Sequence, residues 1–254
     1  GRMQGETQAG YALALHFDLL PEAVCPAAVK HLVAGVTRYG GHLSTGIQTT
    51  HRLMLELARH GYADTAWLVL TNRTFPSWGF TLDQGATTIW ERWDGYVPER
   101  GFQDCGMNSF NHWALGAVGE WMMREMAGLH PDESQPGYRH FLIRPRPGGG
   151  VTWVKASYDS IHGRIVCNWK TGTQFELNLT VPANTTATVW LPTDDPATIR
   201  EGRSPLSRAR GIRRVETQPG RVTLDVEAGE YRFVTATRPP RPDRSAGPER
   251  PDRR

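Results

Sequence analysis

Apolar residues recur at helical spacing through the first half of the chain, and Gly and Pro residues separate the runs. Val29, Leu32 and Val36, for example, fall on one side of a helix. Asn108 or Ser109 can cap the last of these runs. The pattern predicts helices, arranged as successive hairpins, over 7–20, 22–39, 47–60, 62–72 and 109–128.

Beyond about residue 137 the pattern changes to an alternation of apolar and polar residues, which is typical of strands with one buried face. Phe175, Leu177 and Leu179 form one such run, and Gly, Pro and Asn turns separate it from its neighbours. Repeated short strands of this kind indicate an antiparallel β-sandwich. The predicted strands centre on residues 141–143, 151–153, 165–169, 175–179, 189–191, 222–226 and 231–233.

These two patterns divide the chain, whose 254 residues suffice for two domains of ordinary size. They predict a multidomain α and β protein, with a helical domain over 1–130 and a β-sandwich over 137–236. Residues 237–254 are rich in Pro, Arg and Asp and predict a disordered basic tail. A further cluster of arginines predicts a solvated loop rather than a basic patch: Arg200, Arg203, Arg208, Arg210, Arg213 and Arg214.

Charge and composition exclude several functions. The formal net charge is +3, and the tail alone supplies six Arg against three acids, so the rest of the chain is close to neutral. This balance does not call for a nucleic-acid partner, and no apolar run reaches membrane-span length. Cys25, Cys105 and Cys167 lie far apart, without a metal-binding spacing or a disulfide framework. Because HExxH and phosphate-loop motifs are also missing, we expect neither a metal nor a cofactor.

The first residues carry neither an initiator Met nor a signal peptide, since Gly1-Arg2 leads almost directly into helical pattern. We therefore expect a truncated reading frame or a processed piece of a longer protein. Localisation stays open between cytoplasmic and secreted.

Candidate chemistry concentrates in the long connection 73–107, because loops of that length inside a compact domain are usually functional. There Glu91 lies between Trp90 and Trp93, and a second polar stretch follows at 106–113. Aromatic faces beside acids and amides suit a sugar, which offers C–H faces for stacking and hydroxyls for hydrogen bonds. The alternative is a partly buried tryptophan corner with Glu91 in an ion pair to an arginine. We expect Trp90 to pack under the site, whereas Trp93 either lines it or packs under it.

His112 falls in the first turn of the predicted helix 109–128. The positive end of a helix opposes protonation, so a neutral imidazole is expected there. A neutral imidazole can both donate to and accept from sugar hydroxyls. The alternative is a helix-start residue that bonds to a loop carbonyl.

A set of longer motifs points to a family: Thr7-Gln8-Ala9-Gly10-Tyr11, Gly41-His42-Leu43-Ser44-Thr45-Gly46, Pro76-Ser77-Trp78, Trp90-Glu91-Arg92-Trp93-Asp94 and Asn108-Ser109-Phe110-Asn111-His112. On these motifs the chain, from about residue 7 to about residue 190, resembles bacterial α-L-rhamnosidases of glycoside hydrolase family 78. The resemblance implies the C-terminal portion of a catalytic (α/α)6 barrel over 1–130, followed by the family's β-sandwich. It also implies a rhamnose-containing glycoside as the substrate.

The resemblance further implies roles for single residues. The family's enzymes invert, and their general base is the glutamate at the position of Glu91. The histidine at the position of His112 contacts rhamnose, and Trp93 and Asn108 are the other expected substrate-binding residues. The family's general acid belongs to a motif of the type Asp-x-Pro-x-Arg-Asp-Glu-Arg, which this chain does not contain.

Nearby carboxylates give no ground for a replacement acid. Asp83 and Glu99 carry no sign of that role, and Asp94 is expected to orient Arg92 or to cap a turn. Gln103-Asp104-Cys105 departs from the Asn-Pro-like turn expected before the second motif, which puts the loop geometry there in question.

Three hypotheses therefore compete. The chain is the C-terminal segment of an inverting α-L-rhamnosidase that needs the N-terminal part of the barrel for activity, or a non-catalytic carbohydrate-binding module of the same fold. In the third hypothesis it is a structural piece whose motifs are only inherited. The aglycone and the oligomeric state do not follow from the sequence.

Overall fold

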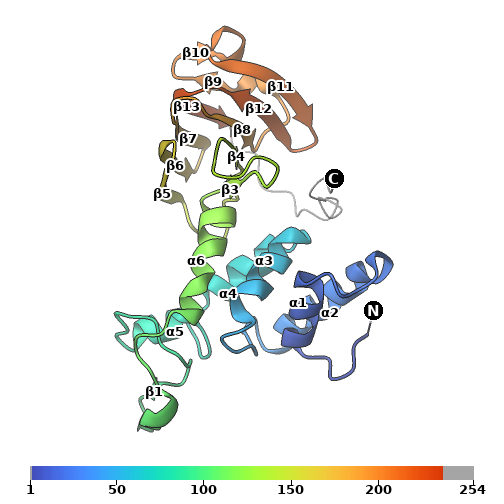
Figure 1. Ribbon diagram of the computed structural model, residues 1–254, viewed down its shortest axis with the longest axis vertical. Helices are drawn as coiled ribbons and strands as arrows, with labels where there is room; N and C mark the ends of the chain where they lie inside the picture. The colour runs from blue at the N-terminus through green and yellow to red at the C-terminus, as the bar shows by residue number, and fades with distance from the viewer. Residues whose placement is uncertain (1, 237–254) are drawn as a thin grey trace. The chain divides into compact units, whose positions relative to one another are not determined.

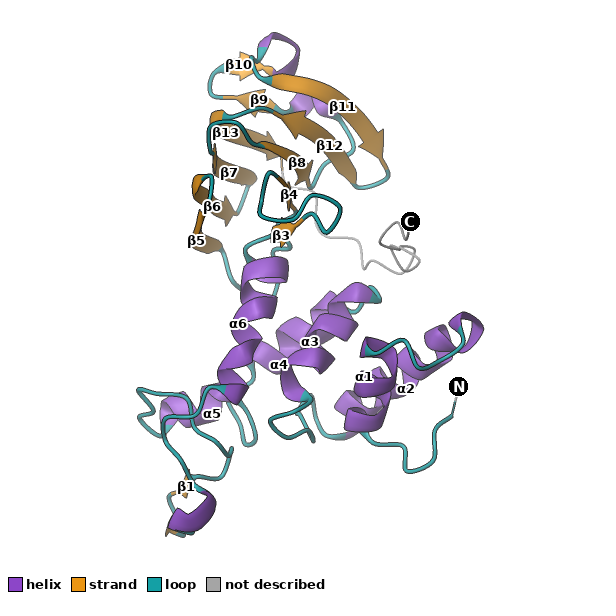
Figure 2. Ribbon diagram, in the orientation of Figure 1, coloured by secondary structure: helices purple, strands orange, loops and turns teal. Residues whose placement is uncertain are grey.

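The computed structural model describes residues 2–236, and these form two compact units (Figure 1). The first unit ends at Trp121 and the second begins at Met122. Helices dominate the first unit and strands the second (Figure 2). The expected domain bounds 1–130 and 137–236 remain predictions, and the expected tail 237–254 lies outside the described residues.

Successive helices build the first unit. They are α1 (Gln8–His16), α2 (Cys25–Arg38), α3 (Thr50–Arg59), α4 (Ala63–Thr71) and α5 (Trp78–Asp83), with a 3₁₀ turn at Glu22–Val24. Helix α1 packs on α2 and α3, and α3 packs on α4 and on a later helix, α6 (Val118–Trp121). The predicted helical repeat is confirmed on α2, where Val29, Leu32 and Val36 are fully buried.

The predicted helix 109–128 is wrong at its start. Residues 108–113 are not helical, and a 3₁₀ turn (Ala114–Ala117) leads into α6 and then into a π-helical turn (Met122–Met126). Trp121 of α6 meets Trp67 of α4 edge to face, with ring centroids 5.2 Å apart.

The long connection also differs from the prediction. It contains α5, whose first turn is capped by Ser77 through a 3.0 Å hydrogen bond from the Phe80 N–H to Oγ. It also contains a short two-stranded ladder of β1 (Tyr96–Val97) and β2 (Gly101–Phe102) and a 3₁₀ turn at Cys105–Met107.

Two sheets form the second unit. The six-stranded sheet has the order β10-β9-β13-β7-β6-β5, and the five-stranded sheet has the order β11-β12-β8-β4-β3. Their bounds are β3 (Leu129–Pro131), β4 (His140–Ile143), β5 (Trp153–Ser160), β6 (Gly163–Thr171), β7 (Gln174–Val181), β8 (Thr186–Leu191), β9 (Arg200–Glu201), β10 (Ser204–Pro205), β11 (Ile212–Gln218), β12 (Arg221–Val226) and β13 (Gly229–Ala236). The pairs are antiparallel throughout the described strands, except that β4 runs parallel to β8.

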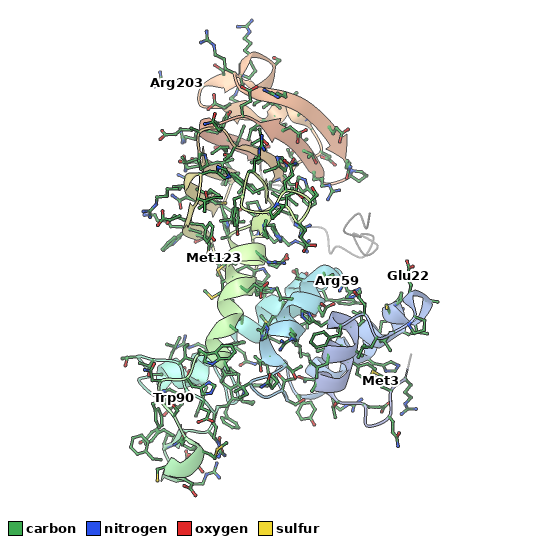
Figure 3. The ribbon with its side chains drawn as sticks, in the orientation of Figure 1. Met3, Glu22, Arg59, Trp90, Met123 and Arg203 are labelled. Carbon is green, nitrogen blue, oxygen red and sulfur yellow. The ribbon has the colours of Figure 1, made fainter. Side chains whose placement is uncertain are left out.

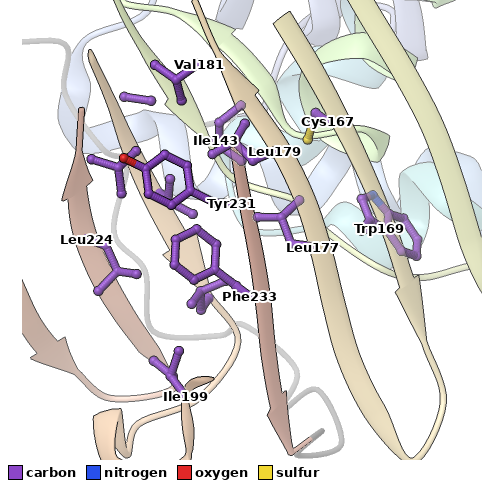
Figure 4. Close-up of a cluster of buried hydrophobic side chains, with 14 of the residues drawn as sticks. Ile143, Cys167, Trp169, Leu177, Leu179, Val181, Ile199, Leu224, Tyr231 and Phe233 are labelled. Carbon is purple, nitrogen blue, oxygen red and sulfur yellow. The ribbon is translucent and has the colours of Figure 1, made fainter. Parts of the chain in front are cut away.

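The inward positions of both sheets share one hydrophobic core (Figure 4). Strict alternation on β7 buries Phe175, Leu177 and Leu179, as the sequence pattern predicts. Cys167 and Trp169 of β6 also tie the core to the chain before β3. The Trp169 indole donates to the Met126 carbonyl at 2.9 Å, and the Cys167 Sγ lies 3.1 Å from the Ala127 carbonyl oxygen. Full burial raises the pKa of the Cys167 thiol to about 12, so this thiol stays protonated.

The sequence predicted that the arginine cluster lies on one solvated loop, and the structure shows that it does not. Arg200 lies on β9 and Arg213 on β11, so the segment forms strands at the edges of both sheets. The side chains of Arg200, Arg203, Arg208, Arg210 and Arg213 are nevertheless exposed. The prediction failed because charged residues on edge strands face solvent on one side and carry no alternating apolar signal.

Candidate active site

The two polar stretches singled out in the sequence lie against each other. The Glu91 N–H donates to the Ser109 carbonyl at 2.9 Å, and the Ser109 N–H donates back to the Glu91 carboxylate oxygen Oε2 at 2.9 Å. On the same side, the His112 N–H donates to the Ile89 carbonyl at 2.9 Å. The Thr88 hydroxyl also bonds to the Phe110 carbonyl. These bonds join residues 88–91 to 109–112 as an extended pair without a regular ladder.

Asn108 closes one end of this pair. Its amide Nδ2 donates to the Gly95 carbonyl at 2.9 Å and to the Gln103 carbonyl at 3.4 Å. A Cβ on Gly95 would lie 2.7 Å from Asn108 Oδ1, so a larger residue at position 95 would displace the Asn108 side chain. Asn108 Oδ1 is buried and has no hydrogen-bond partner among the described residues. In this structure Asn108 organises the loop through its amide donors.

Aromatic rings line the same loops. Trp90, labelled in Figure 3, is only 6% exposed and meets Phe110 edge to face at 5.0 Å, so it packs under the loops as expected. Trp93 is partly buried and meets Trp78 edge to face at 5.1 Å, and the Trp78 indole donates to the Leu115 carbonyl at 3.1 Å. The indole nitrogen of Trp93 is buried and makes no hydrogen bond within the described part of the chain.

The carboxylate of Glu91 is partly buried, and one of its oxygens is held by Ser109. Its other oxygen, Oε1, has no hydrogen-bond partner among residues 2–236. The alternative of an ion pair with an arginine gains no support, because the neighbouring Arg92 binds Asp94 instead. Its Nε and Nη2 donate to the two Asp94 oxygens at 2.9 and 3.0 Å, and this bonding lowers the pKa of Asp94. Asp94 therefore orients Arg92, which was one of the two expectations for it.

His112 does not lie within a helix, so the argument from the positive helix end rests on a wrong premise. Its Nδ1 accepts the Ala114 N–H at 3.2 Å, at the start of the 3₁₀ turn. An Nδ1 that accepts a hydrogen bond carries no proton, so the neutral ring carries its proton on Nε2 and can donate from there. The ring also stacks on Trp113, with centroids 6.3 Å apart and planes 11° apart.

Two residues take part in the site in ways that the sequence analysis did not predict: Ser109, which was considered only as a possible helix cap and as part of a motif, and Trp113. Ser109 holds Glu91 through its main chain, which leaves no side-chain signal. Trp113 is 78% exposed although it is large and apolar, and it stacks on His112. The adjacent His112-Trp113 pair was the available signal for this second residue.

Asp83, Asp94 and Glu99, the other carboxylates considered from the sequence, are either paired with an arginine or exposed. Asp83 forms an ion pair with Arg73, and Asp94 forms one with Arg92. Glu99 is exposed in the turn between β1 and β2. Within residues 2–236, no cluster of His, Cys, Asp or Glu is suited to hold a metal ion. No helix in that range is long and apolar enough to cross a membrane.

Comparison with known protein families assigns this arrangement of helical hairpins and a following β-sandwich to the glycosidases. Residues 1–126 match the family model of the bacterial alpha-L-rhamnosidase 6 hairpin glycosidase domain, and residues 128–204 match that of the bacterial alpha-L-rhamnosidase C-terminal domain. The chain belongs to the bacterial α-L-rhamnosidase family. The resemblance seen in the motifs and the predicted fold class are thereby confirmed.

Curated relatives agree with this assignment. An α-L-rhamnosidase of Streptomyces avermitilis is 43% identical over 92% of this chain, and one of Formosa agariphila is 35% identical over 89%. The chain spans only 22% and 24% of the lengths of these two proteins.

Solved structures show the same likeness. The S. avermitilis α-L-rhamnosidase complexed with L-rhamnose matches with a TM-score of 0.84 and 42% identity, over 92% of this chain and 22% of that one. The α-L-rhamnosidase from Dictyoglumus thermophilum matches with a TM-score of 0.78 and 29% identity, over 91% of this chain and 25% of that one.

Proposed function

We propose that this chain supplies the general base and part of the sugar site of an inverting α-L-rhamnosidase. The observation that carries the proposal is the carboxylate of Glu91, which is fixed through Oε2 while Oε1 stays unbonded among the described residues. The S. avermitilis relative was solved with L-rhamnose, which supports a terminal α-L-rhamnosyl residue as the substrate.

Inverting hydrolysis needs a base that removes a proton from water on one face of the sugar and an acid that protonates the leaving oxygen on the other. Oε1 of Glu91 would take the proton of the attacking water, while the bond from Ser109 fixes the direction of the carboxylate. His112 would donate from Nε2 to a rhamnose hydroxyl. Trp93 would offer its partly exposed ring to the sugar. Asn108 would hold the loop that follows Trp93 through its hydrogen bond to the Gly95 carbonyl.

The general acid would come from outside this chain. Asp83 and Asp94 are both engaged with arginines, and the acidic motif of the family is not present in the sequence. General acid assistance contributes roughly 10²–10⁴-fold to such reactions. The 254-residue chain alone should therefore release no rhamnose from aryl α-L-rhamnosides.

The test is a chimera in which this chain replaces the matching segment of the S. avermitilis α-L-rhamnosidase, to which it is 43% identical. Glu91→Gln keeps the bond from Ser109 but removes the basicity. We expect kcat to fall by roughly 10²–10⁴-fold, with KM nearly unchanged, because the lost interaction acts on water in the transition state. Glu99→Gln, at an exposed carboxylate of the same loops, is the matched control and should leave kcat unchanged.

Added azide extends this test. It needs no deprotonation, so it should restore part of the turnover of the Glu91→Gln chimera and give a glycosyl azide of inverted configuration. Near-normal kcat in Glu91→Gln would remove Glu91 from the mechanism. If the 254-residue chain alone bound rhamnose and the wild-type chimera did not hydrolyse aryl rhamnosides, this segment would be a carbohydrate-binding module.

A further inference from the structure

The outward face of the six-stranded sheet carries an open groove over β5, β6 and β7. The groove has a volume of about 460 Å³, and its lining includes Trp153, Lys155, Asn168, Lys170, Glu176 and Asn178. The strand register explains this set, because Trp153 lies opposite Lys170, and Asn168 lies between Lys155 and Asn178. Ile165, Cys167 and Trp169 of β6 point into the core, so the residues that alternate with them face out.

Trp153 is the unusual member of this face. Its side chain is 62% exposed, and its ring stacks on no other aromatic ring of residues 2–236. A tryptophan that stays this exposed gains little of the free energy that its burial would contribute to folding. An indole ring surrounded by amides and charges is the environment that a sugar ring requires, because one face of the sugar is apolar and its edge is polar.

The amides beside Trp153 are held in fixed directions. Asn168 Oδ1 accepts the Ala156 N–H at 3.0 Å, so its Nδ2 donors are turned away from that strand. Asn178 Nδ2 donates to Glu176 Oε1 at 3.2 Å, which fixes the second amide. Amides whose orientation is already fixed lose little rotamer freedom when they bind a ligand hydroxyl.

Charge on this face is mainly positive. The charge of Glu176 is neutralised by Arg232, whose Nη2 lies 2.7 Å from Glu176 Oε2. Lys170 Nζ lies 3.3 Å from the same carboxylate oxygen. Lys155 forms no ion pair among the described residues, and Lys170 is 64% exposed. The groove therefore presents more cationic than anionic charge to a ligand.

The face is also elongated. A second depression of about 270 Å³ continues the groove along β5 and β6, and it shares Lys155 and Asn168 with the first. At its far end Arg164 donates to Ser157 Oγ at 2.7 Å. From Trp153 to Ser157 the strand rises by roughly 13 Å, so the strip suits several linked sugars better than one ring.

We propose that this strip binds a uronate-containing carbohydrate chain, with Trp153 as the stacking platform and Lys155 and Lys170 as partners of the sugar carboxylates. Binding here needs no hydrolysis and does not rest on the proposed function of Glu91. The strip would hold an acidic polysaccharide while another part of it is processed.

The test is affinity electrophoresis of the 254-residue chain in gels that contain polygalacturonate or a neutral galactan. Polygalacturonate should retard the chain, and galactan should retard it less. Trp153→Ala and the double variant Lys155→Gln/Lys170→Gln should each weaken retardation by polygalacturonate roughly tenfold, the scale of one lost charge-assisted hydrogen bond or one lost apolar side-chain contact. Salt should weaken the binding of the wild type more than that of the lysine variant.

The matched control is Tyr39→Ala, which removes an aromatic side chain of similar exposure (56%) from the helical unit, outside the candidate active site, and should leave retardation unchanged. Glu91→Gln should also leave it unchanged, so failure of this proposal and failure of the catalytic one are separable. Circular dichroism checks that each variant is folded.

Three results would overturn the proposal. The first is the absence of retardation by polygalacturonate, and the second is equal retardation of the wild type and Trp153→Ala. The third is a dimer in light scattering that becomes a monomer in Trp153→Ala, since the strip and the edge strand β5 would then join two copies of this chain.

Discussion

Glu91 and His112 are positioned by main-chain groups rather than by side chains. The carboxylate of Glu91 is held by the N–H of Ser109, eighteen positions along the chain, and the ring of His112 accepts the N–H of Ala114. The sequence motifs predicted that Glu91 and His112 belong to one site. They did not predict these bonds, because a main-chain N–H is the same for every residue type except proline.

Two substitutions separate the proposed role of His112 as a donor to the sugar from its role as the acceptor of the Ala114 N–H. In the chimera, His112→Ala should raise KM by roughly tenfold, because the sugar loses one hydrogen-bond donor. His112→Asn is the control, since the asparagine oxygen can still accept the Ala114 N–H but the side chain is too short to reach the sugar. Equal increases of KM in both variants would assign His112 to the substrate. An increase in His112→Ala alone would assign it only to the turn at Ala114.

At the scale of elements, periodicity was informative where an element has one buried face. The helix α2 and the strand β7 follow their predicted patterns because each has one face whose apolar residues are mostly buried. The helix predicted from residue 109 begins only at Ala114, because Asn108 bonds to the loop carbonyl of Gly95 rather than capping a helix. The helix α5 has six residues, too few to show a helical repeat, and so it was missed.

Glu176 links three strands and makes the stability of the second unit depend on pH. Hydrogen bonds from Arg232 and from other neighbours lower the pKa of Glu176 from 4.5 to about 2. Because the folded-state pKa is depressed, the contribution of Glu176 is complete above pH 4.5 and is lost as the pH falls toward 2. The partners Arg232 and Lys170 are exposed, so we expect this contribution to be no more than about 1 kcal/mol.

Urea unfolding followed by circular dichroism at pH 7, 4 and 2.5 measures this contribution. Glu176→Gln should unfold at lower urea than the wild type at pH 7, and the difference should become smaller at pH 4 and smaller again at pH 2.5. Glu230→Gln changes an exposed carboxylate on β13 of the same sheet and is the control. A difference that is the same at all three pH values would show that packing, and not charge, is lost.

At the scale of the whole molecule, the two units differ in how completely they cover their apolar residues. The β-sandwich encloses one continuous core. The helical unit exposes large apolar side chains on and beside several helices: Phe17 (55%), Leu19 (70%), Tyr39 (56%), Leu68 (53%), Phe75 (48%) and Leu82 (61%). The segment shared with the S. avermitilis relative is only 22% of that protein, whose remaining length is available to cover such faces. We expect that the hairpins of a complete barrel, where they are present, would cover these side chains.

The last prediction follows from this uneven coverage. Exposed apolar surface promotes association, so the 254-residue chain alone should self-associate with increasing concentration in light scattering. Replacing Leu19 and Leu82 by Ser should reduce the association, whereas Ile161→Ser should not, although Ile161 is 87% exposed in the turn between β5 and β6. In the chimera the association should disappear, because the remaining hairpins of the relative then cover the same residues. A monodisperse monomer whose helices melt cooperatively would show instead that the helical unit is complete without further hairpins.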